Sequence, residues 1–529
     1  MRIVRITIVT FLIHKGNFMT KITRRRFLED SLIASFATSA ATVALPDALV
    51  QQAFAGRAAD ANDQIGMAII GIGGRSSGHL NYFTKDKRTK ILYLCDHDLK
   101  RAQQQCKAIE EKFGYRPKAV ADFRKALEDK SVDAVSCAST NHWHALTTIW
   151  SLQAGKHCYM EKPLTYNIHE GKAIVAAAKK YGLVVQTGTQ NRSAKHMIEC
   201  AKFVHDGGIG DVNFARGLCY KRRKAIGPLG NYPVPEGIDY DLWSGPAQIL
   251  PPTRRRFHYD WHWQRYYGNG DLGNQGPHQT DIARWFLGVE RFPQSVISYG
   301  GRLGYDIEMN DPNYVDAGDT ANTEVSIYDY GDKCMVFETR GLETLNLNIP
   351  VGDNLGTQVG VIAYGSKGYA IQGSARSQSY DVSFAYDLEG KEIKRFEGRD
   401  NHYENFVDAV LAGNPSMVTA DARCGDLSAA VSHLGNISYY LGEKNKVSID
   451  ELKDFLKSVK SLDDNLATLE RTVAHLEANK VDLKRTPLAL GPMLNIDVEK
   501  EIFIGNDDAN AMMTRDYRAP YVVPKPEDV

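Results

Sequence analysis

Short apolar runs alternate with amphipathic segments over residues 66–187. The runs lie at 66–70, 91–95, 132–138, 157–160 and 183–187, and each has the length of one buried strand. Between them, segments 99–113, 122–127, 145–154 and 169–181 carry apolar residues at helical spacing. Apolar strands that alternate with helices are typical of a parallel sheet covered on both faces. The pattern therefore predicts an α/β fold with a doubly wound parallel sheet.

The pattern changes after about residue 190. Strand-like segments at 212–219, 296–299, 323–330, 334–339, 359–364 and 391–396 are joined by turns rich in Gly, Asp and Asn. Such short turns connect antiparallel strands. Helical spacing returns at 402–411 and 425–441, and the stretch 453–483 is amphipathic and charged. We predict a first domain over 56–190, an α/β domain with a mostly antiparallel sheet over 191–400, helices over 401–445 that return to the first domain, and a C-terminal helical extension over 446–529.

Composition excludes several classes of protein. Hydrophobic residues make up 43% of the 529 residues and charged residues 24%, as in an ordinary globular protein. Sixty-four basic side chains balance 64 acidic ones, so net charge gives no reason to expect a nucleic-acid partner. The eight cysteines show neither a C-x-x-C pair nor zinc spacing, and we predict no metal site.

The first 55 residues have the features of a targeting segment. Thr23-Arg24-Arg25-Arg26-Phe27-Leu28 is a twin-arginine signature, and the apolar stretch 32–45 that follows is too short to span a membrane. Ala53-Phe54-Ala55 fits a cleavage site for small residues. We therefore expect a twin-arginine signal peptide over 1–55, export of the folded protein to the periplasm, and no membrane anchor.

A glycine-rich loop follows the first predicted strand. In Gly71-Ile72-Gly73-Gly74-Arg75-Ser76, the first glycine permits a tight turn and the next lets the backbone approach a pyrophosphate. Ser76 stands where the usual motif has its third glycine. Asp96 ends the second strand, where a carboxylate accepts hydrogen bonds from ribose hydroxyls and repels a 2′-phosphate. The context predicts a Rossmann-type domain that binds NAD rather than NADP, although Arg75 leaves NADP open.

Polar residues follow the later strands of the same domain. We expect Thr140, Asn141 and His144 to contact the cofactor, because ligands bind beyond the carboxyl ends of parallel strands. After the next strand, Glu161-Lys162-Pro163 places a lysine between an acid and a proline, which restricts the backbone before it. We expect Glu161 beside the cofactor and Lys162 beside the nicotinamide.

Two further groups of residues are candidates for substrate contacts. Gln190 and Arg192 follow the last strand of the parallel sheet and are predicted to line the same cleft. The stretch 254–263 is rich in aromatic residues, which either stack on sugar rings or pack within the protein. Within it, His258 and His262 have i, i+4 spacing, but no H-E-x-x-H order supports a metal.

These motifs, in this order, resemble the Gfo/Idh/MocA oxidoreductases. The resemblance rests on Gly71 to Arg75, Asp96-His97-Asp98, Thr140 to His144, Glu161-Lys162-Pro163 and the stretch 268–281, and it covers roughly residues 65–445. The family implies a Rossmann domain, a second domain with an open sheet that often serves oligomer contacts, and hydride transfer between a nicotinamide and a sugar or cyclitol carbon.

The resemblance also implies roles for particular residues. Lys162 matches the family lysine between nicotinamide and substrate, and His278 matches the histidine that transfers the proton. The family usually has aspartate where this chain has Asn274, which can still hydrogen-bond a substrate hydroxyl. Asp271 and Asp281 are the candidates to compensate for the missing charge. We therefore expect His278 as base, Lys162 as polarising group and relay, and Asn274 at the reacting carbon.

The sequence leaves three functional hypotheses. The first is a periplasmic, NAD-dependent oxidoreductase that acts on a sugar, glycoside or cyclitol and forms a homo-oligomer through its open sheet. The second is a glycosidase that uses NAD transiently, by oxidation, elimination and re-reduction. The third is a dinucleotide-bound structural or sensing protein.

Overall fold

The computed structural model describes residues 64–344, 359–373 and 381–529. The predicted twin-arginine segment and its cleavage site, within residues 1–55, lie outside the described residues. Among the described residues, every helix falls short of the length and hydrophobicity that a membrane span needs. The described residues belong to one compact unit.

The first sheet has six parallel strands in the order β3-β2-β1-β4-β5-β6. This is the doubly wound order that the alternating pattern predicted, and it confirms the Rossmann-type sheet. The strands are β1 Ile65–Ile70, β2 Thr89–Cys95, β3 Lys118–Val120, β4 Ala134–Cys137, β5 His157–Met160 and β6 Val185–Thr187. Every residue of β1 is buried, as expected of a central strand with helices on both faces.

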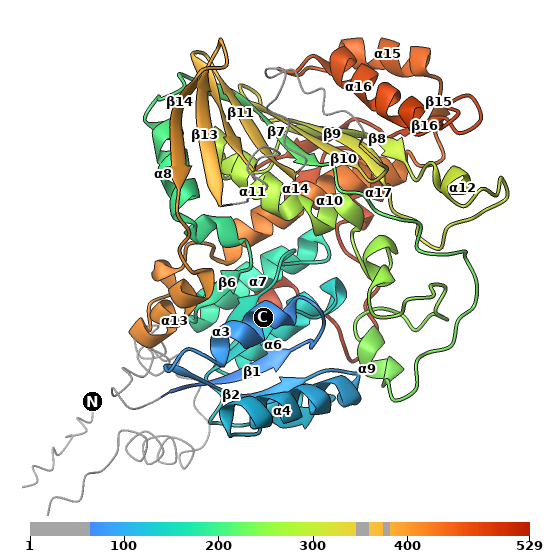
Figure 1. The fold of residues 1–529 in the computed structure, drawn as a ribbon. Coiled ribbons are helices and arrows are strands. Elements are labelled where there is room, and N and C mark those ends of the chain that lie inside the picture. Colours follow the sequence, from blue (N-terminus) through green and yellow to red (C-terminus); the bar gives the residue numbers. More distant parts are fainter. Residues whose placement is uncertain (1–63, 345–358, 374–380) are drawn as a thin grey trace, which may run out of the picture. The chain divides into compact units, whose positions relative to one another are not determined.

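Two apolar cores cover the two faces of this sheet. Met67 and Ile69 of β1 point into a core with α3 Ser76–Phe83, α4 Leu99–Phe113 and α13 His402–Ala412. Ala68 and Ile70 point into the other core, which contains α5 Arg124–Leu127, α6 His144–Gln153 and α7 Ile168–Tyr181. Helix α13 therefore returns to the first domain from far along the chain (Figure 1).

Local sequence sets the ends of the longer helices. The side chain of Asp98 accepts a hydrogen bond from Arg101 N at the start of α4, and Asn167 accepts one from Glu170 N at the start of α7. Gly114 and Gly182, in the left-handed region at φ 73° and 60°, end the same two helices. These caps fix where strands β2 and β6 are joined to their helices.

The second sheet is large and mostly antiparallel, as predicted, although β7 and β10 pair in parallel. Its main path is β14-β13-β12-β11-β7-β10-β9-β8-β16-β15, with β17 beside β8 and β18 beside β17. The strands are β7 Val212–Cys219, β8 Ser295–Gly301, β9 Thr323–Asp329, β10 Cys334–Arg340, β11 Val359–Gly365, β12 Gly368–Gln372, β13 Val382–Asp387, β14 Glu392–Glu397, β15 Lys446–Val447, β16 Leu488–Leu490, β17 Leu494–Asp497 and β18 Ile502–Phe503.

Helices cover one face of this sheet and part of the other. Helices α8 Lys195–His205, α11 Gly276–Leu287 and α14 Ala422–Leu441 share one core with it. On the opposite face, α15 Ile449–Ser458 and α16 Asn465–Ala478 pack against β8, β9 and β10 (Figure 1). The C-terminal extension was predicted to be helical, but it also supplies strands β15 to β18. The sheet that was expected to be open is thus covered in part by its own chain.

A buried ion network joins α16 to this face. Arg216 of β7 pairs with Glu338 of β10 and with Asp463, just before α16, and Arg340 lies 3.1 Å from Glu338. Arg216 and Glu338 are each about 1% exposed. Buried charges are tolerated because each one has an opposite partner.

Short elements complete the described chain. They are η1 Asn141–Trp143, η2 Gln190–Ser193, α9 Tyr240–Ser244, η3 Asp260–Trp263, α10 Gly270–Asn274, α12 Tyr305–Glu308, η4 Pro415–Met417, α17 Asp507–Ala511 and η5 Pro526–Asp528.

Candidate active site

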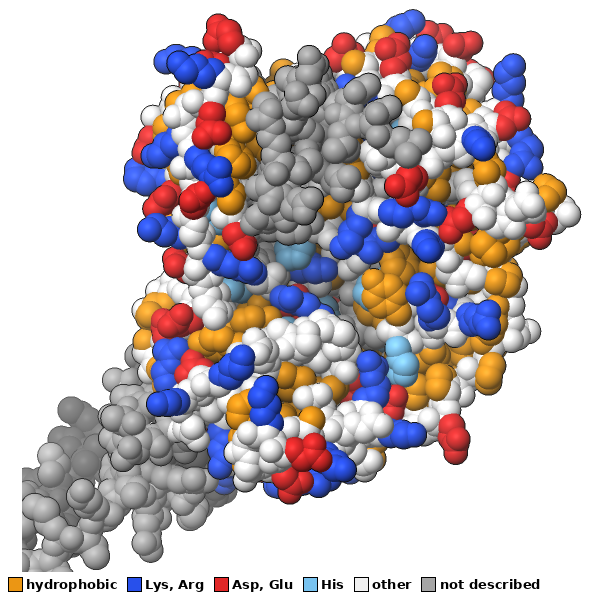
Figure 2. Space-filling model, viewed as in Figure 1, with side chains coloured by type: hydrophobic (Ala, Val, Ile, Leu, Met, Phe, Trp, Pro, Cys, Tyr) orange, Lys and Arg blue, Asp and Glu red, His pale blue; other side chains and the backbone are white. Residues whose placement is uncertain are grey.

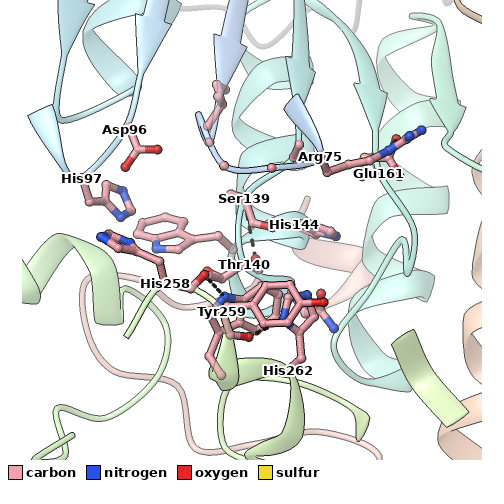
Figure 3. Close-up of a pocket in the computed structure, with 18 of the residues that line it drawn as sticks. Arg75, Asp96, His97, Ser139, Thr140, His144, Glu161, His258, Tyr259 and His262 are labelled. Atoms are coloured by element: carbon pink, nitrogen blue, oxygen red, sulfur yellow. Dashed lines mark hydrogen bonds and ion pairs between the residues drawn. The ribbon is translucent and has the colours of Figure 1, made fainter. Parts of the chain in front are cut away.

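A cavity of about 320 Å³ lies where the carboxyl ends of β1, β2, β4 and β5 face residues 221–275. This volume lies at the lower end of the ~300–1,000 Å³ typical of a small-molecule site. Figure 3 shows Asp96 and His97 at the ends of the parallel strands, with His258, Tyr259 and His262 facing them from the second domain.

The glycine loop lines this cavity and has the conformation that glycine permits. Gly71 has φ +78°, and a Cβ there would lie 2.6 Å from Ser139 N. A Cβ at Gly73 would meet only the end of Arg101 at 4.0 Å, and one at Gly74 would meet nothing within 4 Å. Gly71 is therefore needed by the fold, whereas Gly73 and Gly74 leave free space beside the backbone.

Asp96 lines the cavity at the end of β2, as predicted, and also holds the loop. Its Oδ2 accepts a hydrogen bond from Ile72 N at 2.6 Å, and its Oδ1 accepts one from Asp98 N at 2.9 Å. The carboxylate thus fixes the glycine loop against the second strand. Each of its oxygens retains a lone pair for a ribose hydroxyl.

Glu161 anchors Arg75 across the loop. Its carboxylate accepts hydrogen bonds from Arg75 Nε at 2.7 Å, from His79 Nε2 at 3.2 Å and from Gln190 Nε2 at 3.2 Å. Burial alone would raise the pKa of Glu161, but the hydrogen bond from His79 and the charge of Arg75 outweigh it and lower that pKa. Glu161 therefore remains charged and keeps Arg75 beside the glycine loop (Figure 3).

Lys162 and Asn274 meet inside the cavity. Lys162 Nζ donates to the backbone oxygen of Asn274 at 2.6 Å and to its Oδ1 at 3.1 Å. Burial lowers the pKa of Lys162 to about 8, against the raising effect of Glu161, and the nearby charges of Arg75, Lys221 and Arg223 lower it further. The amine is therefore poised to exchange a proton near neutral pH.

His278 stands near Lys162 but does not line the cavity wall; Gln275, one turn earlier, does. It begins the first turn of α11 after Pro277, and the pKa of its imidazole is lowered to about 3, first by burial and then by the charge of Lys162. His278, the base expected from the sequence, is therefore a weaker proton acceptor than an ordinary histidine. In this setting the imidazole is neutral at physiological pH and holds a proton less strongly than Lys162.

The loop after β4 contacts the cavity and braces it. Asn141 Nδ2 donates to Asn269 Oδ1 at 2.8 Å and so ties the first domain to the second. His144 places Nδ1 2.6 Å from Pro163 O and Nε2 3.1 Å from Ser139 O, which connects the loops after β4 and β5. Thr140, Asn141 and His144, the predicted cofactor contacts, all line the cavity.

Four of the predicted contacts lie outside the cavity lining. Ser76 is buried and donates to Gly73 O at 2.7 Å, so it shapes the loop from within. Gln190 binds Tyr159 and Glu161 behind the loop. Arg192 and Asp281, expected at the substrate, form a two-pronged ion pair with each other at 2.8 Å. This buried pairing satisfies both charges without a ligand.

The aromatic segment 254–263 divides between packing and cavity. Phe257 and Trp261 belong to a buried aromatic cluster with Trp243, and Tyr259, Trp261 and His262 line the cavity. His262 stacks on Trp261 at 3.7 Å between ring centroids, and His258 lies 3.3 Å from Asp98. Within the described ranges, no group of three His, Cys, Asp or Glu side chains could hold a metal ion.

Sequence reasoning missed two basic residues in the cavity, Lys221 and Arg223. Both follow directly after β7. The signal was present in their position, because residues just past a strand end often reach a site, but nothing in the local pattern brings this strand near Lys162.

The cavity fits a dinucleotide. Free space beside Gly73 and Gly74 admits a pyrophosphate to the backbone, Arg75 and Arg101 supply positive charge there, and Asp96 faces the place of a ribose. Lys162 and Asn274 lie within the same lining, where a nicotinamide and an alcohol would meet.

Comparisons with known proteins agree with this geometry. Residues 65–189 match the model of the oxidoreductase family with an NAD-binding Rossmann fold, and residues 215–303 match the C-terminal alpha/beta domain of that family. A scyllo-inositol 2-dehydrogenase (NAD(+)) of Bacillus subtilis is 24% identical over 67% of this chain and 89% of its own length. A levoglucosan dehydrogenase of Pseudarthrobacter phenanthrenivorans is 27% identical over 35% of this chain, a match that spans 41% of that relative.

A solved structure from Desulfitobacterium hafniense, provisionally named an NADPH-dependent oxidoreductase, shares the fold. It superposes with a TM-score of 0.54 at 16% identity and covers 72% of this chain and 96% of its own. Residues 65–189 and 215–303 thus carry the two domains of the Gfo/Idh/MocA family of NAD-binding oxidoreductases, and the glycine loop, Lys162 and Asn274 lie within them.

Proposed function

We propose that this protein oxidises a hydroxyl-bearing ring carbon of a sugar or cyclitol with NAD, or reduces the corresponding ketone. The observation that carries the proposal is Lys162 Nζ, held at 2.6 Å by Asn274 in the same cavity as the glycine loop. The similarity to an NAD(+)-dependent scyllo-inositol dehydrogenase and a levoglucosan dehydrogenase supports a cyclic polyol as substrate.

Different residues along the cavity are assigned to different parts of the cofactor. Gly73, Gly74 and Arg75 would hold the pyrophosphate and Asp96 would hold a ribose, while Glu161 keeps Arg75 in place. When bound, NAD supplies the nicotinamide ring that accepts the hydride. The chain's own task is to orient the alcohol and take its proton.

Lys162 is the proposed proton acceptor. Its pKa of about 8 leaves an appreciable neutral fraction at physiological pH, and Asn274 fixes the direction of Nζ. His278, neutral and next to Lys162, is the second group on the proton's path. In the reverse direction the charged form of Lys162 donates the proton to the ketone oxygen. Tyr259 and Trp261 offer the aromatic surface against which a sugar ring packs.

The test is NADH formation by purified protein supplied with NAD and a panel of inositols, levoglucosan and methyl glycosides. Lys162→Met should lower kcat/KM by roughly 10²–10⁴-fold, the usual weight of a positioned acid–base group. Lys195→Met is the matched control, because Lys195 is 58% exposed on α8 and away from the cavity. Full turnover by the Lys162 variant would reject its role, and no NADH with any polyol would reject the oxidation.

The same preparation separates the glycosidase alternative. Incubation with aryl glycosides should produce NADH in step with oxidised product. Release of the aglycone without net NADH would instead establish transient oxidation followed by elimination. Identification of the nucleotide that is released from the denatured protein distinguishes NAD from NADP as the cofactor.

We also propose export by the twin-arginine route and self-association. The basis for export is the run Arg24-Arg25 before an apolar segment, which lies outside the described residues. Arg24→Lys with Arg25→Lys should retain the protein in the cytoplasm, as measured by cell fractionation. Exposed Leu388 and Ile393, before and within the edge strand β14, favour pairing there, and light scattering of the mature protein measures it.

A further inference from the structure

We propose that the cavity contains a subsite for the carboxylate of a sugar acid, formed by Lys221 and Arg223. This inference rests on the proposed function and narrows its substrate class from neutral sugars to uronic or related acids. It is carried by the position, pairing and charge of these two side chains.

Both residues lie at the substrate end of the cavity. They follow strand β7 and line the same wall as Lys162, Asn274 and Gln275. Their charges reach Lys162, since each contributes to the lowering of its pKa. The pyrophosphate end is distinct, because there Arg101 approaches Gly73 and pairs with His258. Figure 2 shows Lys, Arg and His side chains around the hollow of this face.

Arg223 is preoriented to bind an anion. Its Nε donates to Asp271 Oδ1 at 2.8 Å, and its guanidinium lies 5.2 Å from the ring centre of Trp263. Asp271 is buried, at 1% exposure, and also accepts from Trp263 Nε1 at 3.4 Å. Within the described residues the two terminal nitrogens of Arg223 have no hydrogen-bond partner. A guanidinium fixed at Nε with its outer nitrogens free is suited to an oxyanion.

Lys221 supplies a second, unneutralised charge. It is exposed and makes no ion pair or hydrogen bond within the part of the chain that the structure describes. Lys221 and Arg223 carry two positive charges, and Asp271 offsets one of them. One positive charge therefore remains beside Lys162, which matches a singly charged carboxylate better than a doubly charged phosphate. Binding that carboxylate would also relieve the repulsion between Lys221 and Lys162.

The experiment compares matched pairs of methyl glycosides and methyl uronosides of the gluco, galacto and manno series. Affinity for the NAD-loaded protein is measured by calorimetry, and turnover by NADH formation. The wild-type protein should bind at least one acid more tightly than its neutral partner. Lys221→Gln should reduce that preference on the order of tenfold, the effect of one charge-assisted hydrogen bond.

One control and one further variant sharpen the comparison. Lys224→Gln removes a neighbouring exposed lysine that does not line the cavity and should leave the preference intact. Arg223→Lys keeps a charge near Asp271, so the fold is retained, but loses the planar pair of donors and should also weaken the preference for acids.

The outcomes distinguish this inference from the proposed function. Equal affinity for acid and neutral partners, or an equal loss for both in the Lys221 variant, overturns the subsite. A preference for the corresponding sugar 6-phosphates overturns the assignment to a carboxylate. Tight binding of an acid without NADH formation supports the subsite and contradicts the oxidation. NADH formation from neutral sugars alone supports the oxidation and contradicts the subsite.

Discussion

The electrostatic setting of Lys162 controls the chemistry of this site. Its neighbours include three cations, Arg75, Lys221 and Arg223, and one carboxylate, Glu161. Where an aspartate would add a second carboxylate, this chain has the neutral Asn274, which accepts from Nζ through both its oxygens. The amine consequently releases its proton more readily than an exposed lysine.

This setting predicts a pH dependence. The rate of alcohol oxidation should rise with pH through about 8, because only neutral Lys162 accepts a proton. In Asn274→Asp, the added carboxylate stabilises the ammonium and raises the pKa of Lys162, so the rising limb should move to higher pH. Steady-state kinetics across pH measures the shift. Asn274→Leu adds no charge, and an upward shift in that variant as well would contradict the explanation.

The sequence alone identified Lys162 but not its surroundings. Lys162 was predicted from its place between Glu161 and Pro163, and its cavity position agrees with the prediction. The pairing of Arg192 with Asp281 was missed, because nothing in the local pattern shows that a residue after β6 meets one on α11. Lys221 was missed for the same reason: its neighbours in the cavity come from distant parts of the chain.

At the level of elements, a hydrogen bond holds the glycine loop to the end of strand β2. Asp96 accepts from Ile72 N, so the second strand fixes the turn that the first strand enters. The apolar runs predicted β1, β2 and β5 well, since these central strands are buried on both faces. The edge strand β3 was not predicted, because Lys118 is exposed and its two neighbours are only partly buried.

The loop gives a prediction that separates folding from binding. Gly71→Ala forces a Cβ toward Ser139 N at φ +78° and should lower the free energy of unfolding by about 1–3 kcal/mol. Gly74→Ala meets no neighbouring atom, so its stability should change by less than about 0.5 kcal/mol while its affinity for NAD falls. Chemical denaturation and NAD titration measure the two effects; a destabilised Gly74 variant would contradict this reading of the loop.

The ion network beneath α16 gives a prediction about stability. Glu338→Ala would leave Arg216 and Arg340 facing each other without their shared carboxylate inside the sheet. We expect a loss of about 3–5 kcal/mol in the free energy of unfolding, the usual effect of breaking a buried ion pair. Glu392→Ala, on the exposed start of β14, is the control and should cost less than about 0.5 kcal/mol. Equal effects would show that the network contributes nothing.

On the scale of the whole molecule, the sequence predicted both sheets and their order along the chain. It did not predict that residues 446–529 would add strands to the second sheet and then return to the first domain. Short strands such as β15 and β18 have two residues each and carry no periodic signal. The return of the tail depends on side chains such as Tyr521 and Val523, which join the core around β1.

The tail meets the first domain at a carboxyl group that titrates near neutrality. Burial raises the pKa of Glu170 to about 7, although Tyr166 N donates to it at 2.7 Å, and Tyr517 of the tail lies 3.2 Å from it. The folded state therefore holds this proton more tightly than the unfolded chain. Glu170 should favour folding at low pH, and this contribution should be lost as pH rises from about 4.5 through 7.

Glu170→Gln tests this directly. The amide cannot ionise, so the variant should lose less stability than the wild type between pH 5 and 8, by a difference on the order of 2 kcal/mol. Thermal unfolding across pH measures it, with the exposed Glu110→Gln as control. Parallel stability curves for Glu170→Gln and wild type would contradict the assignment.

The tail's contact with α7 also has a consequence for synthesis. Tyr517 and Glu170 are 347 positions apart, yet both belong to the surroundings of one helix in the nucleotide-binding half. A ribosome that has just released the first domain has therefore made a half whose surface still lacks its final cover. The cover of α7 becomes complete only after Tyr517 has been synthesised, so a nascent chain halted midway should remain sensitive to protease around α7.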